Sequence, residues 1–156
     1  MEALKIIVAD NHPVFRTGME MIIKKINESF HVFHAANGLE ILEIIKYNTV
    51  NFVFMDIRMP GMDGIETTYR LKKSNPEMKI IALSTMAEKY DVLKMFKAGA
   101  NGYLLKNASL EKIEMAFRTL IKGENYFTEE IRCFFSGKIC EKFKVYLDKS
   151  LRQELT

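Results

Sequence analysis

The chain has 156 residues, of which 48% are hydrophobic and 28% are charged, and its formal net charge is +3. A chain of this length can fold as one compact domain without a disulfide or a structural metal, and so small a net charge is by itself no argument for nucleic-acid binding. Because no basic start precedes an apolar run and no stretch approaches about 18 uninterrupted apolar residues, we expect no signal peptide and no interaction with a membrane.

Strands and helices alternate along most of the chain. Short apolar runs rich in β-branched residues predict strands at residues 4–9, 30–35, 51–55, 78–83 and 102–105. Apolar residues at helical spacing predict helices at residues 15–26, 39–46, 65–73, 91–98 and 110–121, the last one capped by Ser109. The alternation predicts an α/β fold with a doubly wound, five-stranded parallel sheet, strand order 2-1-3-4-5, and helices on both faces.

The composition changes after Gly123. Thr128 can cap a short helix, which Ser136 and Gly137 should interrupt, and a second helix is predicted over residues 139–155. No further strand follows. We therefore expect residues 1–127 to form the sheet domain and residues 128–156 to form a helical linker or tail. The chain has only two cysteines, which suits the cytoplasm.

Polar side chains follow four of the predicted strands. Asp10 and Asp56 come directly after the first and third strands, and Ser84 and Lys106 after the fourth and fifth. Ligands of such sheets bind beyond the carboxyl ends of the strands, where the strand order reverses, so these side chains should surround one site. Two neighbouring carboxylates suit Mg²⁺, which prefers oxygen ligands. Asp56 could then accept a phosphoryl group, with Lys106 and Ser84 stabilising its oxygens.

Four strings carry a resemblance to a known family. They are Asp-Asn-His-Pro at 10–13, Met-Asp-Ile-Arg-Met-Pro-Gly-Met-Asp-Gly at 55–64, Leu-Ser-Thr at 83–85 and Gly-Ala-Asn-Gly-Tyr-Leu-Leu-Lys at 99–106. Residues 3–131 resemble the receiver domain of bacterial two-component response regulators, of the NarL/FixJ (LuxR-type) subfamily. The resemblance implies the flavodoxin-like, CheY-like receiver fold and a signalling switch that promotes its own aspartyl phosphorylation and dephosphorylation.

The resemblance also implies a role for each site residue. Asp56 would be the phosphoacceptor for a sensor histidine kinase, with Lys106 and Ser84 assisting it. Ser84 and Tyr103 would form the switch pair. The Mg²⁺ ligands would be Asp10, Asn11, Asp56 and the backbone carbonyl of Arg58.

Asn11 departs from the family, which usually has a second acidic residue there. An amide oxygen can still bind Mg²⁺ but carries no charge, so we expect weakened Mg²⁺ binding. The same departure leaves open a pseudo-receiver, an interaction module that works without phosphorylation. A small Mg²⁺-dependent phosphatase would need a carboxylate two residues after the nucleophile, where this chain has Arg58.

The resemblance predicts partners as well. In this subfamily the receiver precedes a helix-turn-helix domain, which commonly opens with a Leu-Thr pair such as Leu155-Thr156. We therefore expect a longer transcription regulator that binds DNA only through that further domain. Activation should produce a homodimer through a surface of the fourth helix, fifth strand and fifth helix, with residues Asp91, Lys94, Lys97, Tyr103, Glu111, Glu114 and Arg118. His31 and His34 face opposite sides of a strand and cannot share a metal ion, and His12 has no second ligand nearby in sequence.

Overall fold

Five parallel strands form one sheet in the order β2-β1-β3-β4-β5, as the sequence predicted. The computed structural model describes residues 3–85 and 89–126. The strands are β1 (Lys5–Ala9), β2 (His31–Ala35), β3 (Phe52–Asp56), β4 (Lys79–Ser84) and β5 (Gly102–Leu105). The helices are α1 (Pro13–Ile26), α2 (Gly38–Tyr47), α3 (Gly64–Ser74), α4 (Lys89–Ala98) and α5 (Leu110–Ile121).

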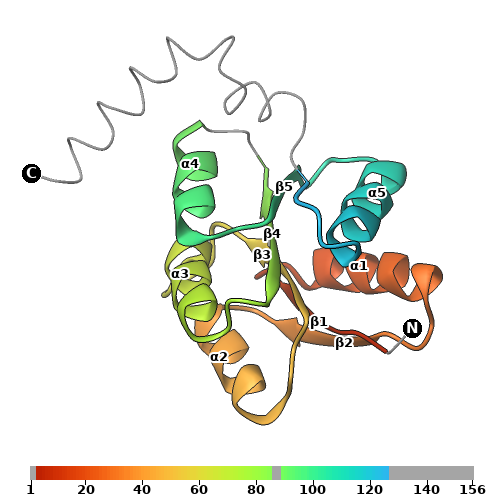
Figure 1. Ribbon diagram of the computed structural model, residues 1–156, viewed down its shortest axis with the longest axis horizontal. Helices are drawn as coiled ribbons and strands as arrows, with labels where there is room; N and C mark the ends of the chain where they lie inside the picture. Colours follow the sequence, from red (N-terminus) through yellow and green to blue (C-terminus); the bar gives the residue numbers. More distant parts are fainter. Residues whose placement is uncertain (1–2, 86–88, 127–156) are drawn as a thin grey trace, which may run out of the picture. The chain divides into compact units, whose positions relative to one another are not determined.

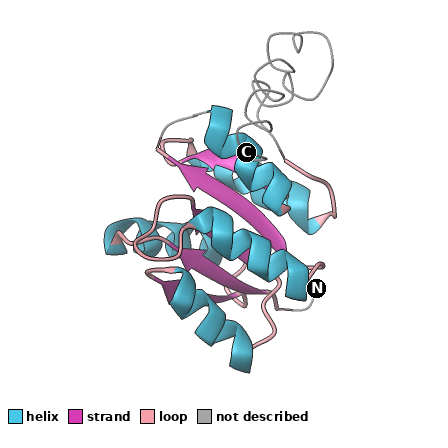
Figure 2. Ribbon diagram, turned by 90° about the vertical axis from the view of Figure 1, so that its left-hand side faces the viewer, coloured by secondary structure: helices cyan, strands magenta, loops and turns pink. Residues whose placement is uncertain are grey.

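The helices cover both faces of the sheet. Helices α1 and α5 pack on one face and α2, α3 and α4 on the other (Figure 1). Figure 2 shows the helices lining the strands in a view turned by 90°. This three-layer arrangement confirms the predicted doubly wound fold, which needs crossover helices on both sides of a parallel sheet.

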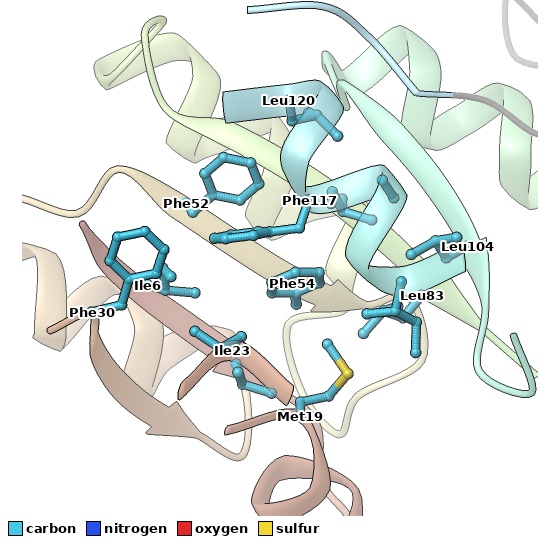
Figure 3. Packing of buried hydrophobic residues seen from close by; sticks show 14 residues of the cluster. Ile6, Met19, Ile23, Phe30, Phe52, Phe54, Leu83, Leu104, Phe117 and Leu120 are labelled. Carbon is cyan, nitrogen blue, oxygen red and sulfur yellow. The ribbon is translucent and has the colours of Figure 1, made fainter. Parts of the chain in front are cut away.

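An aromatic cluster joins α5 to the sheet. The ring of Phe117 lies 4.9 Å from that of Phe52 and 5.8 Å from that of Phe54, while Phe30 approaches its edge at 5.9 Å (Figure 3). Phe52 and Phe54 share a face because alternate residues of a strand point the same way. This cluster fixes α5 on the sheet, and with it the turn that follows β5.

Local sequence signals set the helix starts near the functional edge. Ser109 caps α5 by accepting a hydrogen bond from the backbone N–H of Lys112, as predicted. Asp63 caps α3 in the same way. The loop before α3 also needs Gly64, since a Cβ there would lie 2.3 Å from the backbone oxygen of Asp56. The loop after β3 can therefore pass close to Asp56.

Several predicted boundaries shift by one or two residues. Asp56 and Ser84 are the last residues of β3 and β4 instead of the first residues after them. Within the described residues β2 pairs with β1 alone, at the edge of the sheet, and it exposes His31 and His34. The helices predicted after Gly123, and both cysteines, lie outside the described residues.

Candidate functional site

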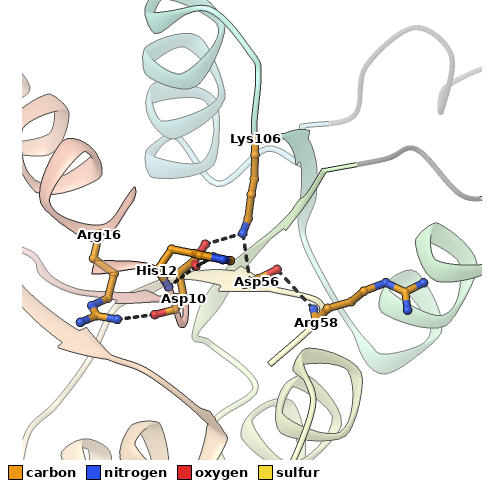
Figure 4. Close-up of polar contacts among 6 residues, drawn as sticks. All are labelled: Asp10, His12, Arg16, Asp56, Arg58 and Lys106. Carbon is orange, nitrogen blue, oxygen red and sulfur yellow. Dashed lines mark hydrogen bonds and ion pairs between the residues drawn. The ribbon is translucent and has the colours of Figure 1, made fainter. Parts of the chain in front are cut away.

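Two carboxylates and one lysine meet at the carboxyl ends of the strands. Asp10 follows β1 directly, Asp56 ends β3, and Lys106 follows β5. Lys106 Nζ lies 2.6 Å from Oδ2 of Asp10 and 3.1 Å from Oδ2 of Asp56 (Figure 4). Strands β1 and β3 are neighbours at the point where the strand order reverses. The structure thus brings these three predicted residues together.

Burial and mutual contact shift the pKa values of Asp56 and Lys106. Burial raises the pKa of Asp56, and the charge of Asp10 adds to this, while the hydrogen bond from Lys106 opposes it. Burial also lowers the pKa of Lys106, but its contacts with the carboxylates of Asp10 and Asp56 outweigh burial and raise the pKa above its ordinary value. Lys106 therefore stays protonated, and two acids share one cation. A second cation would be stabilised at this edge.

The two carboxylate oxygens of Asp10 have different partners. Its side chain is fully buried. Oδ1 accepts hydrogen bonds from the backbone N–H of His12 at 2.8 Å and contacts the imidazole Nδ1 of His12 at 2.9 Å. Among the described residues no donor reaches Oδ2 with hydrogen-bond geometry. Lys106 forms an ion pair with Oδ2, which can also face a metal ion.

The prediction that His12 has no second ligand nearby is wrong. Side-chain ligand atoms of Asp10, His12 and Asp56 lie within 4.8 Å of one another. His12 lies beside the end of β1, because its backbone N–H and its imidazole both contact Oδ1 of Asp10. The two carboxylates of this group fit Mg²⁺, which prefers oxygen ligands.

Asn11 and Arg58 flank the acidic group. Both line an open pocket of about 500 Å³, together with Asp91 and residues of the loop after β3. The backbone N–H of Arg58 donates to Oδ1 of Asp56 at 3.2 Å. The roles of Asn11 and of the Arg58 carbonyl as metal ligands stay predictions.

Ser84 and Tyr103 come from the last two strands. Ser84 is buried, and its backbone carbonyl accepts a hydrogen bond from the N–H of Lys106 at 2.8 Å, so these two residues adjoin. Tyr103 is only 2% exposed. Its neighbour Leu104 belongs to the core under α5, so Tyr103 faces the α4 side of the sheet. The predicted dimer surface is wrong in treating Tyr103 and Asp91 as surface residues, because they are only 2% and 9% exposed.

Sequence reasoning missed three contacts around the site. Besides the His12–Asp10 contact, the ammonium of Lys106 lies 5.0 Å from the ring centre of Phe15. Arg58 also forms an ion pair with Asp91 of α4. The Arg58 and Phe15 contacts join residues far apart in the chain, so no spacing signal could have found them. For His12, the spacing of two residues from Asp10 was the available signal.

Comparisons with known proteins agree with this geometry. The sequence model of the family described as the response regulator receiver domain matches residues 6–118. The oxygen regulatory protein NreC of Staphylococcus aureus (strain JH9) is 37% identical over 124 residues, which are 79% of this chain and 57% of NreC. This chain therefore spans little more than half the length of that relative.

Two solved structures share the fold. A LuxR-family response regulator from Aurantimonas sp. SI85-9A1 has a TM-score of 0.77 at 25% identity, covering 90% of this chain and 98% of that one. The signal receiver domain of a regulator named NarL from Mycobacterium tuberculosis has a TM-score of 0.72 at 30% identity, covering 80% and 100%. Within residues 3–85 and 89–126, no helix is both long and apolar enough to cross a bilayer. The chain belongs to the response regulator receiver domain family and is a receiver of the NarL/LuxR group, a signalling switch.

Proposed function

We propose that this receiver takes a phosphoryl group onto Asp56 from a phosphohistidine of a sensor histidine kinase. The observation that carries the proposal is the position of the Asp56 carboxylate, which lies at the end of β3 between Lys106 and the backbone N–H of Arg58. A carboxylate with a raised pKa beside a lysine suits nucleophilic attack on phosphorus.

The proposed transfer balances without any redox partner. A carboxylate oxygen of Asp56 forms a bond to phosphorus, and the bond between phosphorus and the histidine nitrogen breaks. The electron pair leaves with the imidazole nitrogen, which takes a proton from solvent. The ammonium of Lys106 offsets the charge on the phosphoryl oxygens, and the N–H of Arg58 and the hydroxyl of Ser84 are further donors. Acetyl phosphate can replace the kinase, and hydrolysis of the acyl phosphate returns the carboxylate.

The residues present would hold a divalent cation at this edge. Asp10, Asp56, Asn11 and the carbonyl of Arg58 are the proposed ligands. Mg²⁺, when bound, would neutralise charge on the phosphoryl oxygens and on the carboxylates. Because Asn11 brings no charge, we expect Mg²⁺ to bind with a dissociation constant in the millimolar range or weaker.

Intact-mass spectrometry tests the proposal. With acetyl phosphate and Mg²⁺, the protein should gain the mass of one phosphoryl group, and Asp56→Asn should gain none. Asp63→Asn is the matched control, because Asp63 lines the adjoining pocket and asparagine also caps a helix. A wild-type protein that stays unmodified under saturating donor would contradict the phosphoacceptor role.

We further propose that the receiver controls a longer transcription regulator in the cytoplasm. Residues 1–127 would be the receiver domain and residues 128–156 the linker toward a helix-turn-helix domain that binds DNA. Support comes from the greater length of NreC. Phosphorylation would favour a homodimer through α4, β5 and α5, with Lys94, Lys97 and Arg118 among its residues. Sedimentation with and without beryllofluoride checks this, and an unchanged mass with Asp56 modified would contradict it.

A further inference from the structure

The side chain of Arg58 forms an ion pair across the edge of the acidic site. Its Nη2 lies 3.1 Å from Oδ2 of Asp91, which stands in the first turn of α4. Figure 4 shows the Arg58 side chain pointing away from Lys106. The backbone N–H of the same residue donates to Asp56. Arg58 therefore contacts the phosphoacceptor through its backbone and α4 through its side chain.

The two partners of this ion pair differ in burial. The Arg58 side chain is 73% exposed, whereas that of Asp91 is only 12% exposed. If the pair opens, water can hydrate the exposed guanidinium, but the buried carboxylate stays desolvated. Opening the pair therefore disturbs α4 more than the loop after β3. The dipole of α4 still favours an acidic residue in its first turn, so the expected response is a shift of the helix start and not its unfolding.

A phosphoryl group on Asp56 would offer Arg58 a second anion. It carries about −1.5 to −2 charges, in place of the single charge of the carboxylate, and three acceptor oxygens, and a planar guanidinium can bind such oxygens in pairs. Arg58 and Asp91 line the same open pocket of about 500 Å³, so the side chain has room to turn. Its backbone already lies beside the carboxylate that would be modified.

We propose that Arg58 is a positioning residue that exchanges Asp91 for the phosphoryl group and so transmits the modification of Asp56 to α4. The inference rests on the proposed function, because it needs a modified Asp56. In the unmodified chain the ion pair holds the start of α4 and occupies the guanidinium. After modification the guanidinium turns to the phosphoryl oxygens, and Asp91 loses this cation.

A double-mutant cycle read by beryllofluoride binding in Mg²⁺ tests the exchange. Asp91→Asn removes the competing anion with little change of shape, so it should tighten binding about three- to tenfold. Arg58→Met should weaken binding by a similar factor, and Arg58→Lys should recover part of it. In the Arg58→Met background, Asp91→Asn should change nothing, because it acts only through Arg58.

The matched control breaks an ion pair elsewhere. Glu66→Gln removes the exposed pair with Arg70 on α3, whose atoms lie 3.0 Å apart, and should leave beryllofluoride binding within about twofold. Amide hydrogen exchange of α4 gives a second readout. Without beryllofluoride, the α4 amides of the Arg58→Met protein should exchange as fast as those of the wild type with beryllofluoride bound.

Two results would overturn the inference alone. They are equal effects of Asp91→Asn in both backgrounds, and an Arg58→Met protein that binds beryllofluoride as tightly as the wild type. A wild-type protein that binds no beryllofluoride in Mg²⁺ would overturn both this inference and the phosphoacceptor proposal. The two failures are therefore distinguishable.

Discussion

A partly buried lysine lies at each end of the sheet, and the two lysines have different kinds of partner. At the carboxyl ends, Lys106 lies between the carboxylates of Asp10 and Asp56. At the amino ends of β4 and β5, Lys72 of α3 donates to the carbonyls of Pro76 and Met78 and to the side-chain oxygen of Asn101. All three of its protons have neutral acceptors.

The partners give the two lysines opposite pKa shifts. Burial lowers the pKa of Lys72, and the charge of Lys79 adds to this. Burial acts on Lys106 in the same direction, but its carboxylate partners reverse the result. Lys72 therefore serves as a structural donor that ties α3 to the starts of two strands. Lys106 belongs to a charged group of two carboxylates and one ammonium, whose remaining negative charge a further cation would neutralise.

Replacing either lysine should separate reactivity from stability. We expect Lys106→Met to slow phosphorylation by acetyl phosphate about 100-fold, because it removes the cation nearest the Asp56 carboxylate. Lys72→Met should leave the rate within about twofold. Intact-mass time courses measure both. Equal losses of phosphorylation rate in the two variants would contradict a specific role of Lys106 in the reaction.

Adding an acid should change only the carboxyl end. Asn11→Asp restores an anionic oxygen near Asp10 and should tighten Mg²⁺ about tenfold, because Mg²⁺ favours charged oxygen ligands. Asn75→Asp is the matched control, since Asn75 lines the pocket at the other end of the sheet. Calorimetric titration compares the two. Similar Mg²⁺ affinities for Asn11→Asp and the wild type would place Asn11 away from the metal.

Lys72→Met should lower the free energy of unfolding by about 1–2 kcal/mol, because it removes the donor of three hydrogen bonds. Lys73→Met tests an exposed neighbour on the same helix and should change stability by less than about 0.5 kcal/mol. Urea unfolding gives both values. If Lys72→Met lowered the free energy of unfolding as little as Lys73→Met does, the structural role of Lys72 would be contradicted.

Asp56→Asn should raise stability by about 1 kcal/mol at pH 7 without Mg²⁺, because it removes a desolvated charge beside Asp10. The pKa of Asp56 is raised above 3.8, so the folded state binds this proton more tightly than the unfolded state. The unfavourable contribution fades as the pH falls through the folded pKa, and it is gone below 3.8. The advantage of Asp56→Asn should shrink accordingly in urea unfolding at falling pH. An advantage that is constant with pH would contradict the raised pKa.

The sequence by itself determined the sheet and the residues at its functional edge. Apolar runs and helical periodicity predicted the elements of the described residues to within one or two residues, and the alternation predicted the topology. Asp10, Asp56, Ser84 and Lys106 were found because the carboxyl ends of parallel strands meet at one edge of the sheet, whatever the side chains pack against.

The tertiary structure decided which side chains touch. The burial of Tyr103, the contact of His12 with Asp10 and the ion pair between Arg58 and Asp91 were not predicted. Such contacts depend on the turn after β1, on the loop before α3 and on the placement of α4 against the sheet. Neighbouring residues on a strand or loop contact different partners. The packed structure decides which partner each one contacts, because burial and electrostatic interactions depend on distances in space and not on separation along the chain.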